Sequence, residues 1–200
     1  MGSAYIESNR NGRLKDALLR ASEWMKNCVL CPRMCGIDRA GDERGFCRTG
    51  KLAVIASCGP HFGEERCLVG RSGSGAIFFS HCNLFCEFCQ NNDISIGGQG
   101  IPVGPEELAS IMLTLQGKGC HNINLVTPTH VIQPILEALV IAVDKGLHVP
   151  LVYNCGGYER VSALKLLDGI VDIYMPDIKF WDPNAARELC SAPDYPERAR

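Results

Sequence analysis

The sequence has no long apolar run, and no stretch approaches the about 18 consecutive apolar residues that a membrane-spanning helix needs. The stretch Met1–Lys26 is polar and then amphipathic, without the apolar core of a secretory signal peptide. The net charge is only −2, so no basic surface is expected to draw the chain onto nucleic acid or an anionic membrane. These absences predict a cytoplasmic globular protein with neither kind of partner.

Cysteine, by contrast, is abundant, at 12 of 200 residues. Thiols stay reduced in the cytosol, so cysteines clustered at short spacings favour metal binding over disulfides. Five cysteines are isolated in the sequence, and we expect them to be small buried apolar side chains. They are Cys58, Cys67, Cys120, Cys155 and Cys190. Cys58 and Cys67 are the expected exceptions, because they lie near both cysteine clusters in the sequence.

Strand-like apolar runs alternate with helical patterns in the second part of the chain. The expected strands are Ala76–Ser80, Asn122–Val126, His148–Tyr153 and Ile170–Tyr174, and the expected helices are Pro105–Leu115, Val131–Asp144, Tyr158–Leu167 and Pro183–Cys190. Apolar strands separated by helices predict a parallel sheet covered on both faces. A helix at Leu14–Lys26 and a strand at Leu52–Ala56 are expected before it. The polar run Ser191–Arg200 matches no expected element.

The pattern therefore predicts an α/β protein with two parts. Residues 1–70 would contain a helix and a Cys-rich metal-binding segment, and residues 71–200 would contain the strands and helices of the α/β core.

The most informative motif is Cys82-x3-Cys86-x2-Cys89, which follows directly after the expected strand Ala76–Ser80. Three thiolates on one loop can hold three corners of an iron–sulfur cube. No fourth cysteine lies in the run, so one iron would stay open for catalysis. The alternative is a zinc site with His81 as the fourth ligand, but closed zinc sites usually use two separated ligand pairs. The motif therefore favours a cluster, with His81 facing solvent.

A second cysteine group lies near the N-terminus, with the spacing Cys28-x2-Cys31-x3-Cys35-x11-Cys47. Four thiolates satisfy either a tetrahedral zinc ion or a closed iron–sulfur cluster. Zinc would stabilise a loop that has too few apolar residues for its own core, whereas a cluster could relay electrons to the first site. The spacing does not choose between these two, and a segment without metal is the third alternative.

The triad spacing, with aromatic Phe88 before its third cysteine, resembles the signature of the radical S-adenosylmethionine superfamily. Within it, the chain resembles the proteins that activate glycyl radical enzymes, typified by the pyruvate formate-lyase activating enzyme. The closer match is a less characterised branch of that group. The similarity extends from about Cys28 to Arg200, and its further motifs are Cys28–Gly36 (Cys-x2-Cys-Pro-Arg-x-Cys-Gly), His61–Glu65 (His-Phe-Gly-Glu-Glu) and Gly73–Gly75 (Gly-Ser-Gly).

This resemblance implies a partial (βα) barrel of the radical S-adenosylmethionine type. The usual core has six βα units, and this chain would be truncated after about four. The implied cofactors are a 4Fe-4S cluster on Cys82, Cys86 and Cys89, and S-adenosylmethionine on the open iron. One electron would cleave the sulfonium to give a 5′-deoxyadenosyl radical, which abstracts hydrogen from a substrate. The implied partners are a reductant such as flavodoxin or ferredoxin and a glycyl radical enzyme. A small-molecule substrate is the alternative.

The resemblance also implies cofactor contacts at the ends of the expected strands. Phe88 would pack beside the adenine, or turn into the core. Thr127 and Thr129 stand where activating enzymes carry a Gly-Gly-Glu-Pro turn that binds the methionine amino group. The alternative there is a proline-containing turn in which Thr129 caps the next helix.

Two further positions follow the third and fourth expected strands. Asn154 lies where the family keeps an Asp that contacts the cofactor ribose, and it can still donate and accept hydrogen bonds. Asp177-Ile178-Lys179 matches the family's Asp-x-Lys motif, in which Lys179 would pair with the cofactor carboxylate and Asp177 would position it. The alternative is an exposed ion pair of little energetic value.

Two rival classes stay open from the sequence. One is a non-catalytic iron–sulfur or zinc protein of electron transfer, in which both cysteine groups only hold metal. The other is an inactive fragment that binds a cluster but turns nothing over.

Overall fold

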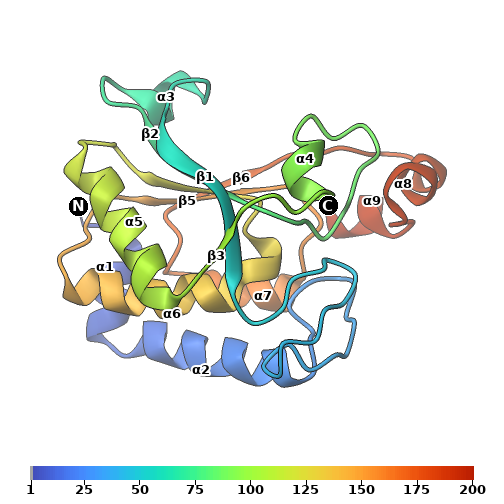
Figure 1. The fold of residues 1–200 in the computed structure, drawn as a ribbon, viewed down its shortest axis with the longest axis horizontal. Coiled ribbons are helices and arrows are strands. Elements are labelled where there is room, and N and C mark those ends of the chain that lie inside the picture. Colours follow the sequence, from blue (N-terminus) through green and yellow to red (C-terminus); the bar gives the residue numbers. More distant parts are fainter. Residues whose placement is uncertain (1) are drawn as a thin grey trace.

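Six strands form one mixed sheet in the computed structural model, which describes residues 2–200 (Figure 1). The strands are β1 (Ala53–His61), β2 (Ser74–Phe79), β3 (Ile101–Val103), β4 (Ile123–Val126), β5 (Leu151–Cys155) and β6 (Ile173–Pro176). Their order across the sheet is β3-β1-β2-β4-β5-β6. The four strands β2, β4, β5 and β6 are parallel and follow the chain order, which confirms the predicted α/β class. The sheet is mixed because β1 runs antiparallel to both of its neighbours.

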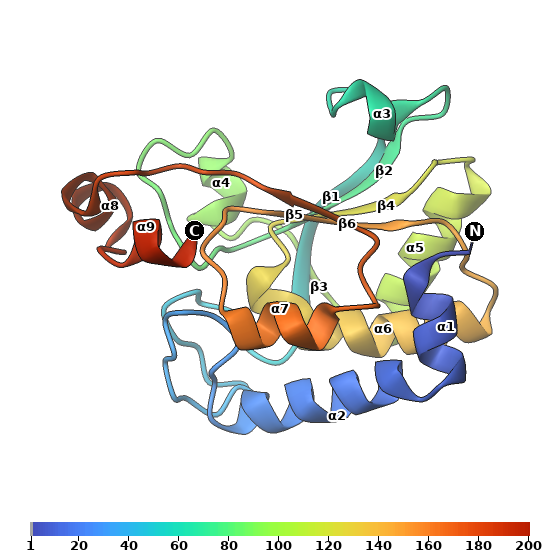
Figure 2. The same ribbon diagram turned by 180° about the vertical axis from the view of Figure 1, so that it is seen from behind.

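The helices are α1 (Ala4–Arg10), α2 (Arg13–Lys26), α3 (Arg66–Val69), α4 (Asn92–Ser95), α5 (Pro105–Gly117), α6 (Ile132–Asp144), α7 (Val161–Leu167), α8 (Pro183–Cys190) and α9 (Tyr195–Arg198), with a 3-10 turn η1 (Thr129–Val131). Helices α5, α6 and α7 lie together on one face of the sheet (Figures 1 and 2). The expectation of helices on both faces is wrong, because no long helix in the described chain lies on the opposite face. The cavity described below lies on that face of the sheet.

Helix α2 forms a third layer against α6. Its buried residues Leu14, Ala17, Ala21 and Met25 recur at the three- and four-residue spacing of one helical face, which explains why this segment is amphipathic. They belong to the same buried cluster as side chains of the sheet and of α5, α6 and α7. Within residues 2–200, none of the helices combines the length and the apolar content that a bilayer crossing requires.

Strands β1 and β6 differ from their expected bounds for reasons that the structure shows. Strand β1 continues through Pro60 to His61, because β3 pairs only with Ala53–Ile55 and leaves Pro60 on an outer strand, where proline is tolerated. Strand β6 begins three residues later than expected. Ile170 and Val171 instead donate to the carbonyl of Leu167 and continue the turn that follows α7.

The polar run Ser191–Arg200 is part of the fold. Tyr195 is fully buried and begins α9, and it stacks on Tyr158 with ring centroids 6.0 Å apart. Together with Leu84 and Phe180, these rings form a second, smaller buried cluster beside the loop that follows β2. The C-terminal residues therefore help to shape the end of the sheet where the cysteine triad lies.

Candidate active site

The triad lies on an ordered loop that begins where β2 ends. His81 and Phe85 have φ values of 69° and 53°, so the chain turns sharply on either side of Cys82. Backbone hydrogen bonds hold the start of the loop, from Ser80 N–H to Val54 O (2.8 Å) and from His81 N–H to Ile94 O (2.8 Å). Leu84 is buried and anchors the loop's middle.

The triad thiols accept hydrogen bonds from their own loop. The amide of Leu84 donates to Cys82 Sγ at 3.3 Å, and the hydroxyl of Ser95 donates to Cys89 Sγ at 3.2 Å. Burial raises the pKa of Cys82 to about 11, although the amides of Leu84 and Phe85 act in the opposite direction. The thiol is therefore protonated at neutral pH in the absence of metal, and metal binding must displace that proton. The amide donors are suited to stabilise the resulting thiolate.

A fourth thiol, Cys190, lies against Cys86. Cys190 is buried at the end of α8, and its thiol donates to Ala186 O at 3.1 Å. The hydrogen bond between the two thiols raises the pKa of Cys86 far above its usual value, and burial acts in the same direction. The sequence correctly predicts that Cys190 is buried. It gives no sign of the contact with Cys86, because the two cysteines lie 104 positions apart in the sequence.

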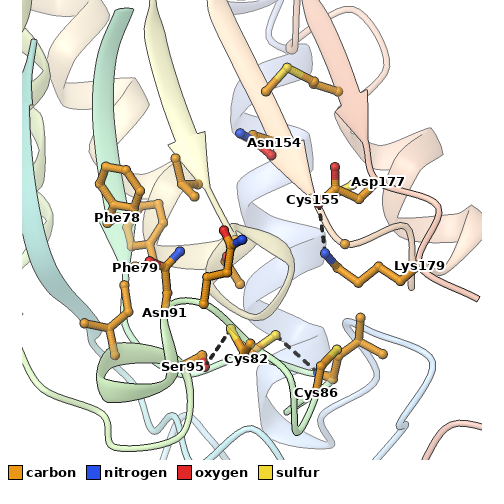
Figure 3. A pocket seen from close by; sticks show the side chains of 18 of the residues that line it. Phe78, Phe79, Cys82, Cys86, Asn91, Ser95, Asn154, Cys155, Asp177 and Lys179 are labelled. Carbon is orange, nitrogen blue, oxygen red and sulfur yellow. Dashed lines mark hydrogen bonds and ion pairs between the residues drawn. The ribbon is translucent and has the colours of Figure 1, made fainter. Parts of the chain in front are cut away.

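A cavity of about 560 Å³ opens beside the triad, at the carboxyl ends of the parallel strands. This is the size range of sites for small molecules and cofactors. The predicted site residues that line it are Cys82, Cys86, Phe88, Cys89, Thr127, Asn154, Asp177 and Lys179. Figure 3 shows Asn154, Asp177 and Lys179 near one another and facing the same cavity as Cys82 and Cys86. Residues from four separate loops are thus brought together.

Lys179 and Asp177 form an ion pair at the end of β6, with Nζ and Oδ2 2.9 Å apart. Burial is the largest single effect and acts to lower the pKa of Lys179, but the hydrogen bond and the charge of Asp177, together with the nearby Cys86 and Tyr195, raise the pKa overall. The Tyr195 hydroxyl accepts from Lys179 N–H at 2.8 Å and lies 2.8 Å from Gly156 O. Tyr195 therefore ties the loop after β5 to the loop after β6. Sequence reasoning missed it, and the only signal was an aromatic residue within a polar run.

The threonines of the Thr127–His130 turn are placed differently from each other. Thr127 lines the cavity, with φ at 61°. Thr129 is buried away from it, and its hydroxyl donates to the carboxylate of Glu159. Thr129 does not cap the next helix either, since α6 has Val131 at its N-cap. The proline-containing turn itself is present, closed by Val131 N–H donating to Pro128 O.

Phe88, which lies within the triad motif, and His81, which precedes it, are placed differently. Phe88 lines the cavity, is 54% exposed and contacts Phe180 edge to face at 5.6 Å. His81 is only partly exposed, and its Nδ1 is buried without a hydrogen-bond partner. A side chain at Gly98 would collide with the His81 ring, so His81 packs against this glycine. The expectation of a solvent-facing His81 is therefore wrong.

The isolated cysteines divide into two groups. Cys120, Cys155 and Cys190 are buried, as predicted. Cys58 and Cys67 are exposed, and neither is among the residues that line the cavity. Cys58 and Cys67 are therefore close to the two cysteine clusters in the sequence but do not line the cavity.

Carboxylates from the β1–β2 connection also reach the cavity, which sequence reasoning did not foresee. Glu64 and Glu65 line it together with His61, whose Nε2 lies 4.0 Å from Glu64. Burial raises the pKa of Glu64. The signal available was the His61–Glu65 motif, which carried no assigned role. Glu64 and Glu65 thus add two carboxyl groups to the lining of the cavity.

The N-terminal quartet forms a separate group on the segment Cys28–Lys51. Cys28, Cys31 and Cys47 are buried, and Cys35 is partly exposed. Burial raises the pKa of Cys31 to about 12, and the other three thiols lie close enough to raise it further. No three His, Cys, Asp or Glu side chains in residues 2–200 are positioned to hold a single metal ion. In neither cysteine group, therefore, do the thiols converge closely enough to bind one metal ion.

Comparison with known proteins gives a relative of similar sequence. The chain is 37% identical over 184 residues to an uncharacterized protein of Methanocaldococcus jannaschii. The match covers 88% of this chain and 52% of the relative, so the chain spans about half the length of the curated relative it matches. No family model matches the chain. The relative's name states no activity, so function has to be argued from the site.

Proposed function

We propose that this chain is a radical S-adenosylmethionine protein of the activating-enzyme type. The supporting observation is that the Cys82, Cys86 and Cys89 loop and the ends of β4, β5 and β6 border one cavity. In α/β folds this edge of a sheet is where active sites are built. The parallel strands β2, β4, β5 and β6, with helices on one face and the cavity on the other, would be part of the superfamily's (βα) barrel.

The triad residues suit a cluster better than a single ion. Thiolates around an iron–sulfur cube stand farther apart than ligands of one zinc, so a triad that cannot hold one ion is compatible with a cube. Cys82, Cys86 and Cys89 would hold three irons, and the donors Leu84 and Ser95 would stabilise two of the thiolates. When bound, the cluster supplies the electron for reductive cleavage of S-adenosylmethionine. The chain's own residues bind and orient that cofactor and limit access of water.

The cavity residues fit the groups of S-adenosylmethionine. The ammonium group of Lys179 would pair with the carboxylate of S-adenosylmethionine, while Asp177 holds that lysine ammonium group in place. Asn154 and Thr127 offer hydrogen bonds to the ribose and the amino group. We further propose that the protein acts in the cytoplasm with a reductant such as flavodoxin or ferredoxin. Its substrate would be a glycine of a glycyl radical enzyme.

An anaerobic assay tests this function directly. The protein is reconstituted with iron and sulfide, reduced with dithionite and mixed with S-adenosylmethionine, and released 5′-deoxyadenosine is quantified by chromatography. We expect at least one equivalent per chain, and none without dithionite. A protein that binds a cluster but releases no 5′-deoxyadenosine would contradict the proposal for this chain.

A second candidate is electron transfer by a closed cluster, and the specific observation in its favour is Cys190. Its thiol contacts Cys86, so a fourth thiolate stands near the triad. A cluster with four thiolates would have no open iron for S-adenosylmethionine. The Asp177–Lys179 pair on the cavity favours the first candidate, because electron transfer alone does not need it.

Replacing Lys179 with Met is expected to weaken S-adenosylmethionine binding about tenfold, because one charge-assisted hydrogen bond contributes about 1.5 kcal/mol. The dissociation constant would be measured anaerobically by calorimetry on reconstituted protein. Lys165→Met, on the exposed face of α7, is the matched control and should leave it unchanged. Equal dissociation constants for the two variants would contradict the proposal that Lys179 binds S-adenosylmethionine.

A further inference from the structure

The segment Cys28–Lys51 is ordered without helix or strand, which is unusual for a loop of this length. Turns hold it locally, from Cys28 N–H to Ile37 O (2.8 Å) and from Met34 N–H to Cys31 O (3.1 Å). Met34 has φ at 42°, so the chain reverses between the second and third cysteines. Backbone turns that present buried thiols within one loop are typical of closed thiolate metal sites.

This segment also holds the triad loop, mainly through Arg33. The Arg33 guanidinium donates from Nε to Asn83 O at 2.9 Å and from Nη2 to Cys190 O at 2.7 Å, and Nη1 donates to Ser191 O. Arg33, which lies between Cys31 and Cys35, therefore binds both the triad loop and the C-terminal segment that carries Cys190.

Three aromatic and cation–π contacts extend this attachment. Phe46, which precedes Cys47, stacks on Phe85 of the triad loop with centroids 5.4 Å apart. The Arg33 guanidinium lies 3.7 Å from the centroid of the Phe46 ring. Arg48, which follows Cys47, lies over Phe85 at 5.0 Å and donates to Ile96 O at 3.1 Å. The residues that contact the triad loop thus lie within two positions of quartet cysteines.

We propose that Cys28, Cys31, Cys35 and Cys47 form a second metal centre of four thiolates, and that this centre braces the triad loop through Arg33, Phe46 and Arg48. The metal is one that prefers thiolates, either zinc or a closed iron–sulfur cluster. The thiols do not yet converge on one ion, so they turn inward on binding. The metal-binding part does not rest on the function proposed for the triad.

The first test measures metal in a variant without the triad, Cys82→Ala/Cys86→Ala/Cys89→Ala. Purified without chelator, it should retain either one zinc per chain or iron and sulfide in equal amounts, measured by mass spectrometry and colorimetry. Adding Cys35→Ser, the least buried quartet position, should reduce that content at least tenfold. Adding Cys58→Ser, an exposed cysteine, should not. A folded triad-free variant that holds neither zinc nor iron overturns the second centre, whether or not the triad binds a cluster.

The second test measures amide hydrogen exchange over residues 82–91 in the same triad-free background. Loss of the quartet metal through Cys35→Ser should accelerate exchange in this loop at least tenfold. Arg33→Gln should do the same while metal content stays unchanged, and Arg20→Gln, on the exposed face of α2, should not. Unchanged exchange in both the Cys35 and Arg33 variants overturns the brace.

Discussion

Cys86→Ala is expected to reduce 5′-deoxyadenosine release at least 100-fold, to the level of protein without a cluster. Cys86 is buried between the loop that holds Cys82 and the end of α8, so no solvent ligand can easily replace its thiolate. Two remaining thiolates hold an iron–sulfur cube poorly, because two of its four irons then lack a protein ligand. Iron content and the visible absorption of the reconstituted variant should fall together with activity.

Cys190→Ala is the informative control, because it removes the neighbouring thiol and leaves the triad intact. If one iron is open, this variant should keep its cluster and at least half of the wild-type release of 5′-deoxyadenosine. The substitution leaves a small space in the cluster of Leu84, Phe180 and Tyr195, which costs about 1–2 kcal/mol of stability. Loss of the iron–sulfur cluster from Cys190→Ala would instead indicate a closed, four-thiolate site and would favour electron transfer.

The free energy of unfolding is expected to fall steeply with acidification because of His130. The His130 ring is fully buried, and its Nε2–H donates to Ser80 O at 2.8 Å. Its Nδ1 has no partner, and the Arg39 guanidinium donates to the His130 carbonyl at 2.7 Å. A proton on Nδ1 would thus be a second buried cation without an acceptor. Burial lowers the pKa of His130 to about 3, against the hydrogen bond to Ser80, and Arg39 and His81 lower it further.

The sign follows from proton uptake on unfolding. In the unfolded chain His130 titrates near its usual pKa of about 6.5, so between pH 6.5 and 3 the unfolded state binds a proton that the folded state rejects. The contribution of His130 is therefore complete above pH 6.5 and is lost as the pH falls toward 3. A gap of this size corresponds to about 5 kcal/mol, a large part of the stability of a small domain.

Glu159 acts in the opposite direction over part of this range. Burial raises its pKa to about 7, against hydrogen bonds from Thr129 and Tyr153. The folded state then holds a proton that the unfolded state has released, so stability falls as the pH rises from about 4.5 to 7. The two effects oppose each other between pH 4.5 and 6.5. We expect the steepest loss of stability below pH 4.5, where the effect of His130 is no longer opposed by that of Glu159.

Urea denaturation between pH 3.5 and 8 checks this profile. His130→Gln should lower stability at pH 7 but flatten the loss below pH 4.5, and His148→Gln, at an exposed position, should keep the wild-type slope. A wild-type protein with equal stability at pH 6 and pH 3.5 would contradict the expectation.

The local patterns of the sequence predict the parallel core well. The apolar runs of β2, β4 and β5 lie within three residues of their expected bounds, because buried parallel strands need such runs. Strand β6 deviates from its expected bounds by as much as β5, and its Ile173 and Tyr174 are 37% and 41% exposed. The apolar run there continued into Ile170 and Val171, which instead pack into the core after α7. The apolar pattern of the sequence alone does not show where the turn after α7 ends and β6 begins.

The site is less predictable, because its long-range contacts have no local signature. The triad and the Asp177–Lys179 pair could be found, since each is a compact motif at a strand end. Tyr195, Cys190 and Arg33 could not, because each acts on a segment more than 15 residues away through a hydrogen bond or a thiol contact. Thr129 was misplaced because a buried carboxylate, Glu159, binds its hydroxyl.

Strand β6 closes the sheet on one side, and within the described chain no strand pairs with its outer edge. Ile178 and Trp181, just beyond it, are 67% and 70% exposed. A bare edge flanked by apolar side chains is a template on which another strand can add. We therefore expect the outer edge of β6 to be the place at which a β-strand of another molecule can pair with this sheet.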